Sequence, residues 1–181
     1  HIGALDFRLG CSSYVVGLQL ASALIESGAA RNVLLITADT YSKLLHPQDR
    51  TVRALFGDGA AATLIGRATS GADAVQVGPF ITGTDGSKAA CLTVPSGGFR
   101  MPRTAQTAQE QTDASGSVRS HDHLFMDGQA IFAFALNTVP SAIDSLLAQS
   151  GHSFEQIDWW VFHQANRFMV ESVATCCRLS L

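Results

Sequence analysis

A cysteine at the start of an apolar segment is the first residue in the sequence whose position indicates chemistry. Cys11 follows Gly10, and residues 12–25 are apolar nearly all round, which is typical of a buried helix. Cys11 is therefore expected at a helix N-terminus, where unpaired N–H groups and the positive end of the helix dipole stabilise an anion. A thiol so placed has its pKa lowered from about 8.5 to between about 3.5 and 7.5. The alternative role is packing, because cysteine is among the most buried residue types.

The elements around Cys11 predict how its side chain is positioned. Residues 5–9 are expected to end a strand, and Gly28 is a natural stop for the helix. Strand, tight turn and buried helix with a nucleophile at the corner is the layout of a nucleophile elbow. The continuous apolar run 32–38 predicts a parallel strand buried on both faces, so the start of the chain is expected to be a right-handed strand–helix–strand crossover.

His163 is the second candidate for chemistry. It follows the apolar segment 157–162, which predicts a strand, and it precedes residues 168–177, which predict a helix. A histidine at the C-terminal end of a strand lies where open α/β sheets collect their catalytic groups. The alternative is a core histidine satisfied by the backbone. Before the strand, a long helix is expected from about Asp127 to residue 150, with Pro140 as a kink.

The middle of the chain alternates between strands and loops. Residues 39–56 predict a polar loop, and residues 57–59 a tight turn that opens the apolar strand 60–66. This glycine pair lacks the rest of any dinucleotide or phosphate-loop pattern. Residues 74–82 predict a further strand, in which Pro79 indicates an edge or a bulge.

Residues 83–120 contain few apolar side chains, and residues 103–113 are polar and of low complexity. A long connection of this kind predicts a functional flap or a disordered insertion. His121 and His123 lie near its end, and two histidines in a polar loop are expected to be solvated rather than bound to a metal.

Composition and charge limit the class of protein. The 181 residues are 46% hydrophobic and 15% charged, against a usual charged share of about 25%. So few charges predict that a partner subunit or further chain covers much of the surface. The net charge of −3 argues against a nucleic-acid or anionic-membrane partner. No apolar run is expected to reach the length of about 18 residues that spans a bilayer.

Cysteine usage and the first residues indicate a compartment. The four cysteines form no Cys-X-X-Cys pair and no metal-ligand spacing, and the first residues show neither a basic leader nor a signal core. A reduced, cytoplasmic setting is therefore expected, with no metal site.

Five short motifs occur in one order along the chain. They are Gly-Cys-Ser-Ser at 10–13, Pro-Gln-Asp-Arg at 47–50, Phe-Gly-Asp-Gly-Ala-Ala at 56–61, Met-Asp-Gly at 126–128 followed by Phe132, and Trp-Val-Phe-His-Gln-Ala-Asn at 160–166. From about Asp6 to Thr175 this series resembles the ketoacyl-acyl-carrier-protein synthase III family. The last motif is the most specific, because plant-type polyketide synthases carry His-Pro-Gly-Gly there and elongating synthases use two histidines.

The resemblance implies an α/β, thiolase-like fold with mixed sheets and a buried central helix. The chain would hold parts of two pseudo-duplicated halves. Residues 1–68 would belong to the first half and residues 69–181 to the second, with a polar insertion at about 84–120. The family's third catalytic residue, an asparagine, comes from a loop well beyond His163. The chain is therefore expected to be a fragment that is inactive alone.

The resemblance also implies roles for individual residues. Cys11 would be the acyl-accepting nucleophile, with its own N–H in an oxyanion hole, and His163 would polarise the carbonyl of a malonyl thioester. Arg50 would contact coenzyme A, as would Arg167, although Arg167 stands one place earlier than the family's second basic residue. The expected tunnel-lining positions are Met126, Gly128, Phe132, Ala135, Ala165 and Asn166.

The implied activity is a decarboxylative condensation. An acyl-CoA would acylate the enzyme, and malonyl-acyl-carrier protein would extend the acyl group in a homodimer that needs no cofactor beyond the coenzyme A thioester substrate. Two alternatives stay open. One is an acyltransferase of secondary metabolism that does not decarboxylate, and the other is a non-catalytic partner subunit.

Overall fold

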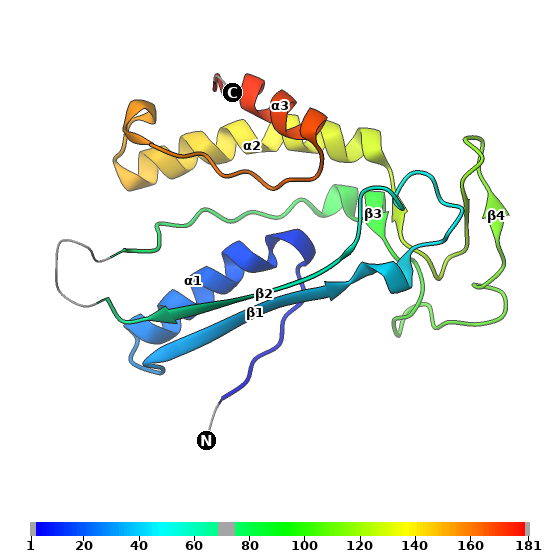
Figure 1. Cartoon of the computed structure of the whole chain (residues 1–181), viewed down its shortest axis with the longest axis horizontal. Helices are drawn as coiled ribbons and strands as arrows, with labels where there is room; N and C mark the ends of the chain where they lie inside the picture. The colour runs from blue at the N-terminus through cyan, green and yellow to red at the C-terminus, as the bar shows by residue number, and fades with distance from the viewer. Residues whose placement is uncertain (1–2, 69–74, 180–181) are drawn as a thin grey trace. The chain divides into compact units, whose positions relative to one another are not determined.

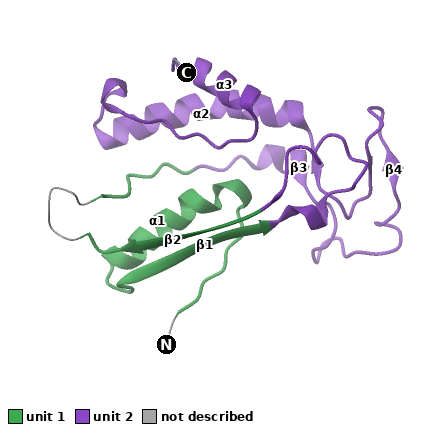
Figure 2. Cartoon of the chain, in the orientation of Figure 1, with its two compact units in different colours: residues 1–39, 59–82 green, residues 40–58, 83–181 purple. Residues whose placement is uncertain are grey.

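The computed structural model describes residues 3–68 and 75–179, which fall into two compact units. The first unit comprises residues 1–39 and 59–82, and the second comprises residues 40–58 and 83–181 (Figure 2). Each unit is described by itself. The expected boundary between two thiolase-like halves at residue 68 stays a prediction.

The first unit consists of one helix and a two-stranded sheet. Helix α1 spans Ser13–Glu26, strand β1 spans Asn32–Thr40 and strand β2 spans Asp58–Gly66. The two strands pair with each other and run in opposite directions, with α1 along them (Figure 1). A Cβ on Gly17 would lie 2.6 Å from Leu35 Cδ1, so glycine lets the helix approach β1 closely.

The first unit buries fewer apolar side chains than the sequence predicts. The buried residues of α1 are Gly17, Ala21 and Ile25, which recur every fourth position, and Leu35 is the buried residue of β1. Leu34 and Ile36 on the other face of β1 are 59% and 63% exposed. The prediction of a strand buried on both faces is therefore wrong for the described chain, because α1 covers one face only.

Three further expectations about strands are wrong. Residues 5–9 form no strand, so the predicted parallel crossover is replaced by the antiparallel pair β1–β2. Residues 75–82 form no strand either, because Gly78 has a φ of +123° and Pro79 lacks an N–H for a ladder. Ala74 lies outside the described residues.

The third wrong expectation concerns residues 157–162, which are extended but form no strand in the described part of the chain. Trp159 and Val161 are 85% and 87% exposed, whereas Trp160 packs against Phe154 with ring centroids 4.8 Å apart. This alternation is the pattern of a strand with one covered face. The segment has the sequence of a strand without the ladder partners that would make it one.

Two helices of the second unit confirm the sequence prediction. Helix α2 spans Gly128–Ser150, with Asp127 capping its N-terminus and Gly151 ending it at a φ of +71°. Pro140 lies inside it. Helix α3 spans Arg167–Cys176 and packs on α2, where Phe132 and Phe168 stack with centroids 5.3 Å apart (Figure 1).

Helix α2 also corrects the expectation that no segment is long and apolar enough to span a membrane. It has 23 residues, and an 18-residue window with a mean hydropathy of 1.5 has none of its residues buried. Polar residues such as Asn137 and Asp144 interrupt the apolar run, but the mean hydropathy of the helix is still high enough for a membrane span. One such helix is weak grounds for a membrane span, because core helices of soluble proteins meet the same criteria.

The segment 84–120 contains regular structure, which contradicts one of the two alternatives predicted for it, a disordered insertion. Strand β3, Leu92–Thr93, pairs antiparallel with β6, Phe125–Met126, and strand β4, Gln111–Thr112, pairs antiparallel with β5, Val118–Arg119. Short polar side chains stabilise its turns through local hydrogen bonds, such as those that Asp113 accepts from Ser115 and Ser117. Short 3₁₀ helices complete the chain at Gly10–Ser12, Tyr41–Leu44, Gly86–Cys91 and Phe154–Gln156.

Candidate functional site

Cys11 lies where the sequence predicts, at the head of helix α1. It is the middle residue of the 3₁₀ turn Gly10–Ser12, which leads directly into α1, and its side chain is exposed and free. Gly10 has a φ of +58°, and the Leu9 N–H donates to Ser13 Oγ at 3.1 Å. A left-handed glycine therefore bends the chain so that the thiol stands at the N-terminal end of the helix. Activation of the thiol by the helix dipole stays a prediction.

His163 lies between the extended segment 157–162 and helix α3, and it is exposed. Three residues later, Asn166 Oδ1 accepts from Met169 N–H at 2.8 Å and caps α3. An N-cap residue satisfies one of the free N–H groups of the first turn. Asn166 thus has a structural role that explains its residue type, and its place in a tunnel stays a prediction.

Cys11 belongs to the first unit and His163 to the second. Because each unit is described by itself, the meeting of the sulfur with the imidazole stays a prediction. The structure shows that both residues are exposed, Cys11 in the turn that leads into α1 and His163 three residues before the N-cap of α3.

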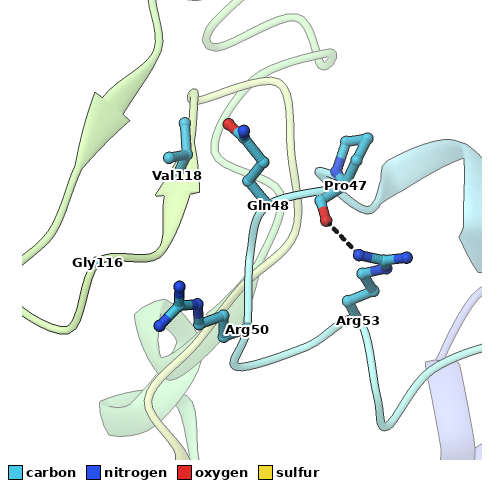
Figure 3. A pocket seen from close by; sticks show the side chains of 6 residues that line it. All are labelled: Pro47, Gln48, Arg50, Arg53, Gly116 and Val118. Carbon is cyan, nitrogen blue, oxygen red and sulfur yellow. Dashed lines mark hydrogen bonds between the residues drawn. The ribbon is translucent and has the colours of Figure 1, made fainter.

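Arg50 borders a hollow of about 330 Å³ within the second unit. Figure 3 shows Arg50 extending towards the β4–β5 hairpin, and Arg53 Nη1 donating to the Pro47 carbonyl at 2.8 Å. Arg50 and Arg53 give the hollow two guanidinium groups, which suit phosphate or carboxylate ligands. Arg53 is a residue that motif reasoning missed. The lining residues are Pro47, Gln48, Arg50, Arg53, Gly116 and Val118.

A buried carboxylate fixes the backbone beside Arg50. The Asp49 side chain is 0% exposed, and its Oδ2 accepts from Arg119 Nη1 at 2.8 Å. Its Oδ1 accepts from Thr51 N–H at 2.9 Å. Arg119 also donates through Nη2 to Asp113, and its guanidinium lies 5.2 Å from the centroid of the Phe125 ring. Arg119 was missed because it lies 70 residues from Asp49 in the sequence, inside a segment expected to be unstructured.

The charges of this network stabilise each other. The hydroxyl of Ser115 and the N–H of Ser117 lower the pKa of Asp113 to about 2, with a further contribution from Arg119. Burial by itself would lower the pKa of Arg119, but the hydrogen bonds to Asp49 and Asp113 outweigh it and raise that pKa. Asp113 and Arg119 are therefore both charged at neutral pH.

His46 and His123 lie beside the ion-pair network, and His46 belongs to the loop that contains Arg50. His46 is buried, and its Nδ1 accepts from Gln48 N–H at 3.1 Å while its Nε2 lies 3.0 Å from Glu110 Oε1. His123 Nδ1 accepts from Ser120 N–H at 3.2 Å, and the His46 and His123 rings meet edge to face at 4.9 Å. Burial, followed by the charge of His46, lowers the pKa of His123. The expectation that His123 is solvated is therefore wrong, whereas His121 is exposed.

The remaining predicted site residues lie in or beside α2 and α3. Arg167 forms an exposed ion pair with Glu171, with Nε 2.6 Å from Oε1, and exposed pairs of this kind contribute little stability. Met126 lies in β6, where its Cε is 3.8 Å from the position a Cβ would take on Gly128. Phe132 stacks on Phe168. Ala135 is half-buried on α2 and Ala165 is half-buried just before α3, and the tunnel that these positions would line stays a prediction.

Comparison with known proteins identifies relatives along nearly the whole chain. A family profile described as 3-oxoacyl-[acyl-carrier-protein (ACP)] synthase III matches residues 5–86. The beta-ketoacyl-[acyl-carrier-protein] synthase III of Chlamydia caviae is 36% identical over 174 residues, covering 96% of this chain and 49% of the relative. The protein of that name from Caldanaerobacter subterraneus is 36% identical over 180 residues, covering 99% of this chain and 51% of the relative.

A solved structure is also similar to the chain. The crystal structure of a 3-oxoacyl-(acyl-carrier-protein) synthase III superposes with a TM-score of 0.95 at 52% identity, covering 99% of this chain and 53% of that one. This match confirms the expected α/β, thiolase-like fold. The chain spans about half the length of the curated relatives it matches.

Proposed function

Because the chain belongs to the 3-oxoacyl-[acyl-carrier-protein] synthase III family, we propose that the full-length protein is a condensing acyltransferase of fatty-acid biosynthesis. Its substrates are an acyl-CoA and malonyl-acyl-carrier protein, and it works as a cytoplasmic homodimer. The observation that carries this proposal is the exposed Cys11 at the head of α1, in a chain that also carries His163 three residues before the N-cap of α3.

In the first half-reaction the Cys11 thiolate attacks the carbonyl carbon of the acyl thioester. Backbone N–H groups at the helix head, including that of Cys11, stabilise the tetrahedral oxyanion, and each such donor contributes about 3 to 4 kcal/mol. Collapse of the intermediate expels coenzyme A as a thiolate, which takes up a proton. The acyl group is left on Cys11 Sγ.

In the second half-reaction malonyl-acyl-carrier protein loses carbon dioxide. The electron pair of the broken C–C bond forms an enolate, whose oxygen accepts a hydrogen bond from His163. A neutral imidazole that donates from one ring nitrogen is sufficient for this role. The enolate carbon then attacks the acyl carbon on Cys11. The thiolate leaves, and the product is a 3-ketoacyl-carrier protein two carbons longer.

Intact-mass measurement tests the nucleophile. Full-length protein incubated with acyl-CoA is expected to gain the mass of one acyl group, and the Cys11→Ser variant is expected to gain none. Cys91→Ser, which removes another free thiol, is the matched control and keeps the adduct. An acyl adduct that persists in Cys11→Ser would refute the assignment of Cys11.

Carbon dioxide release separates the candidate reactions. The acylated enzyme is expected to release one carbon dioxide from malonyl-acyl-carrier protein for each 3-ketoacyl product. Acyl transfer to an acceptor without release would instead identify the non-decarboxylating acyltransferase. The absence of any acyl adduct would identify the non-catalytic subunit.

A further inference from the structure

One buried ion-pair network joins two segments of the second unit that are far apart in the sequence. Arg119 donates through Nη1 to Asp49 and through Nη2 to Asp113. The side chains of Asp49 and Arg119 are 0% and 18% exposed, so the pair is largely removed from water. Loss of one partner from such a pair leaves a buried charge uncompensated, which makes the pairing a strong constraint on both segments.

The network holds the backbone on both sides of Arg50. Asp49 precedes Arg50, and its carboxylate accepts from Thr51 N–H, the amide that follows Arg50. On the hairpin side, Val118 N–H donates to the Gln48 carbonyl at 3.3 Å. The backbone around Arg50 is thus tied to the β4–β5 hairpin, whereas the Arg50 side chain is itself exposed at the hollow.

We propose that Arg119 is a positioning residue for the nucleotide end of a coenzyme A thioester. Through Asp49 it fixes the loop that presents Arg50, and through the hairpin it fixes Gly116 and Val118 as the facing wall of the hollow (Figure 3). A guanidinium held on a rigid loop binds a phosphate with less loss of conformational entropy than one on a mobile loop. This inference rests on the proposed function, which makes coenzyme A a substrate.

A shortened substrate distinguishes a positioning role of Arg119 from a general structural role. The test compares acyl-CoA with the same acyl group on pantetheine, which lacks the nucleotide and its phosphates. In full-length Arg119→Lys the KM for acyl-CoA is expected to rise about tenfold and kcat to stay within about twofold, because ground-state binding alone is weakened. The KM for acyl-pantetheine is expected to stay unchanged.

Two further variants test the same pair. Asp49→Asn is expected to reproduce the effect of Arg119→Lys. If Arg119→Lys unfolds, the double variant Asp49→Asn with Arg119→Gln replaces it, because this variant leaves no buried charge unpaired. Arg100→Lys, an exposed arginine outside the network, is the control that changes neither KM. Equal losses on both thioesters, or no loss on either, would overturn the positioning role.

Arg50→Ala distinguishes this inference from the proposed function. If Arg50→Ala raises the KM for acyl-CoA alone while Arg119→Lys changes nothing, the positioning role fails and the coenzyme A assignment stands. If the unmodified protein uses acyl-CoA no better than acyl-pantetheine, the coenzyme A assignment itself fails.

Discussion

Asn166 shows how a single residue that belongs to a specific motif can have a purely structural explanation. Its side chain caps α3 by accepting from Met169 N–H, and its carbonyl accepts from Val170 N–H at 3.1 Å. The cap sets where α3 begins, and His163 lies three residues before it. Asn166 therefore fixes the start of α3, three residues after the candidate catalytic histidine.

Substitution of Asn166 separates the cap from a tunnel role. Asn166→Ala is expected to lower the free energy of unfolding by about 1 kcal/mol, because the first turn of α3 loses a hydrogen-bond acceptor. Asn166→Asp, which also caps well, is expected to retain both stability and acylation. Urea unfolding and the intact-mass assay measure the two effects. A loss of acylation in a fully stable Asn166→Asp would contradict the structural account.

Among the elements of the second unit, the β4–β5 hairpin and the loop 46–53 are joined by direct contacts. The Asp49–Arg119 pair and the Val118–Gln48 hydrogen bond connect them. Just beyond the hairpin, the His123 ring contacts the His46 ring of the loop. Because the His123 imidazole accepts the Ser120 N–H at Nδ1, protonation there removes an acceptor. The stability of the structure around His123 should therefore depend on pH.

The sign of that dependence follows from the lowered pKa of His123. Its value in the fold lies below the ordinary 6.5, so the unfolded chain binds more protons below that pH. The stabilisation is fully present above about pH 6.5 and is lost as pH falls through the pKa of the folded state. Hydrogen exchange at the Ser120 amide is expected to show weaker protection at pH 5 than at pH 7.5, once corrected for the intrinsic rate.

His123→Asn provides the control, because an amide oxygen can accept from Ser120 N–H without titrating. The groups that also act on His123 are His46, Asp122, Glu110 and Arg103, and they are unchanged in this variant. The pH dependence of Ser120 protection is expected to flatten. An undiminished dependence in His123→Asn would assign it to another group. Asp113 is expected to contribute a separate loss, because its pKa is lowered from 3.8 to about 2 in the fold, so its stabilisation is present above pH 3.8 and is lost as pH falls to about 2.

At the scale of the whole molecule, each unit leaves apolar surface open. Leu34 and Ile36 on β1 and Leu64 on β2 are exposed in the first unit, and Trp159 and Val161 are exposed in the second. Apolar surface of this extent is typical of interfaces with further protein. The low charged share of the sequence agrees with such covering.

Expression of the 181-residue chain by itself tests this account. The chain is expected to bind an apolar fluorescent dye and to elute above its mass of 19.1 kDa, because open sheet faces associate. The double variant Leu34→Lys with Ile36→Lys is expected to reduce both effects. Gln106→Lys with Gln109→Lys, which adds the same charge at exposed polar positions, is the matched control and does not reduce them. A monomeric chain that binds no dye would contradict the prediction.

The local elements whose signals are short-range could be predicted from the amino-acid sequence. Helices α1, α2 and α3, strands β1 and β2, and the place of Cys11 at a helix head were all predicted from apolar runs, caps and glycines. The family was recognised from five short motifs, which the comparisons confirm. Such features depend on residues within a few positions of one another, so they can be recognised in the sequence without coordinates.

Tertiary structure alone decided which of these elements pair and which side chains meet. Residues 157–162 have the apolar pattern of a strand and form none, because a ladder needs neighbours that local sequence does not specify. The polar segment 84–120 is ordered because Arg119 meets Asp49 across 70 residues and neutralises a carboxylate that is buried completely. Long-range pairs of this kind leave no periodic trace in the sequence. Their energy depends on burial, and burial exists only once the chain has folded.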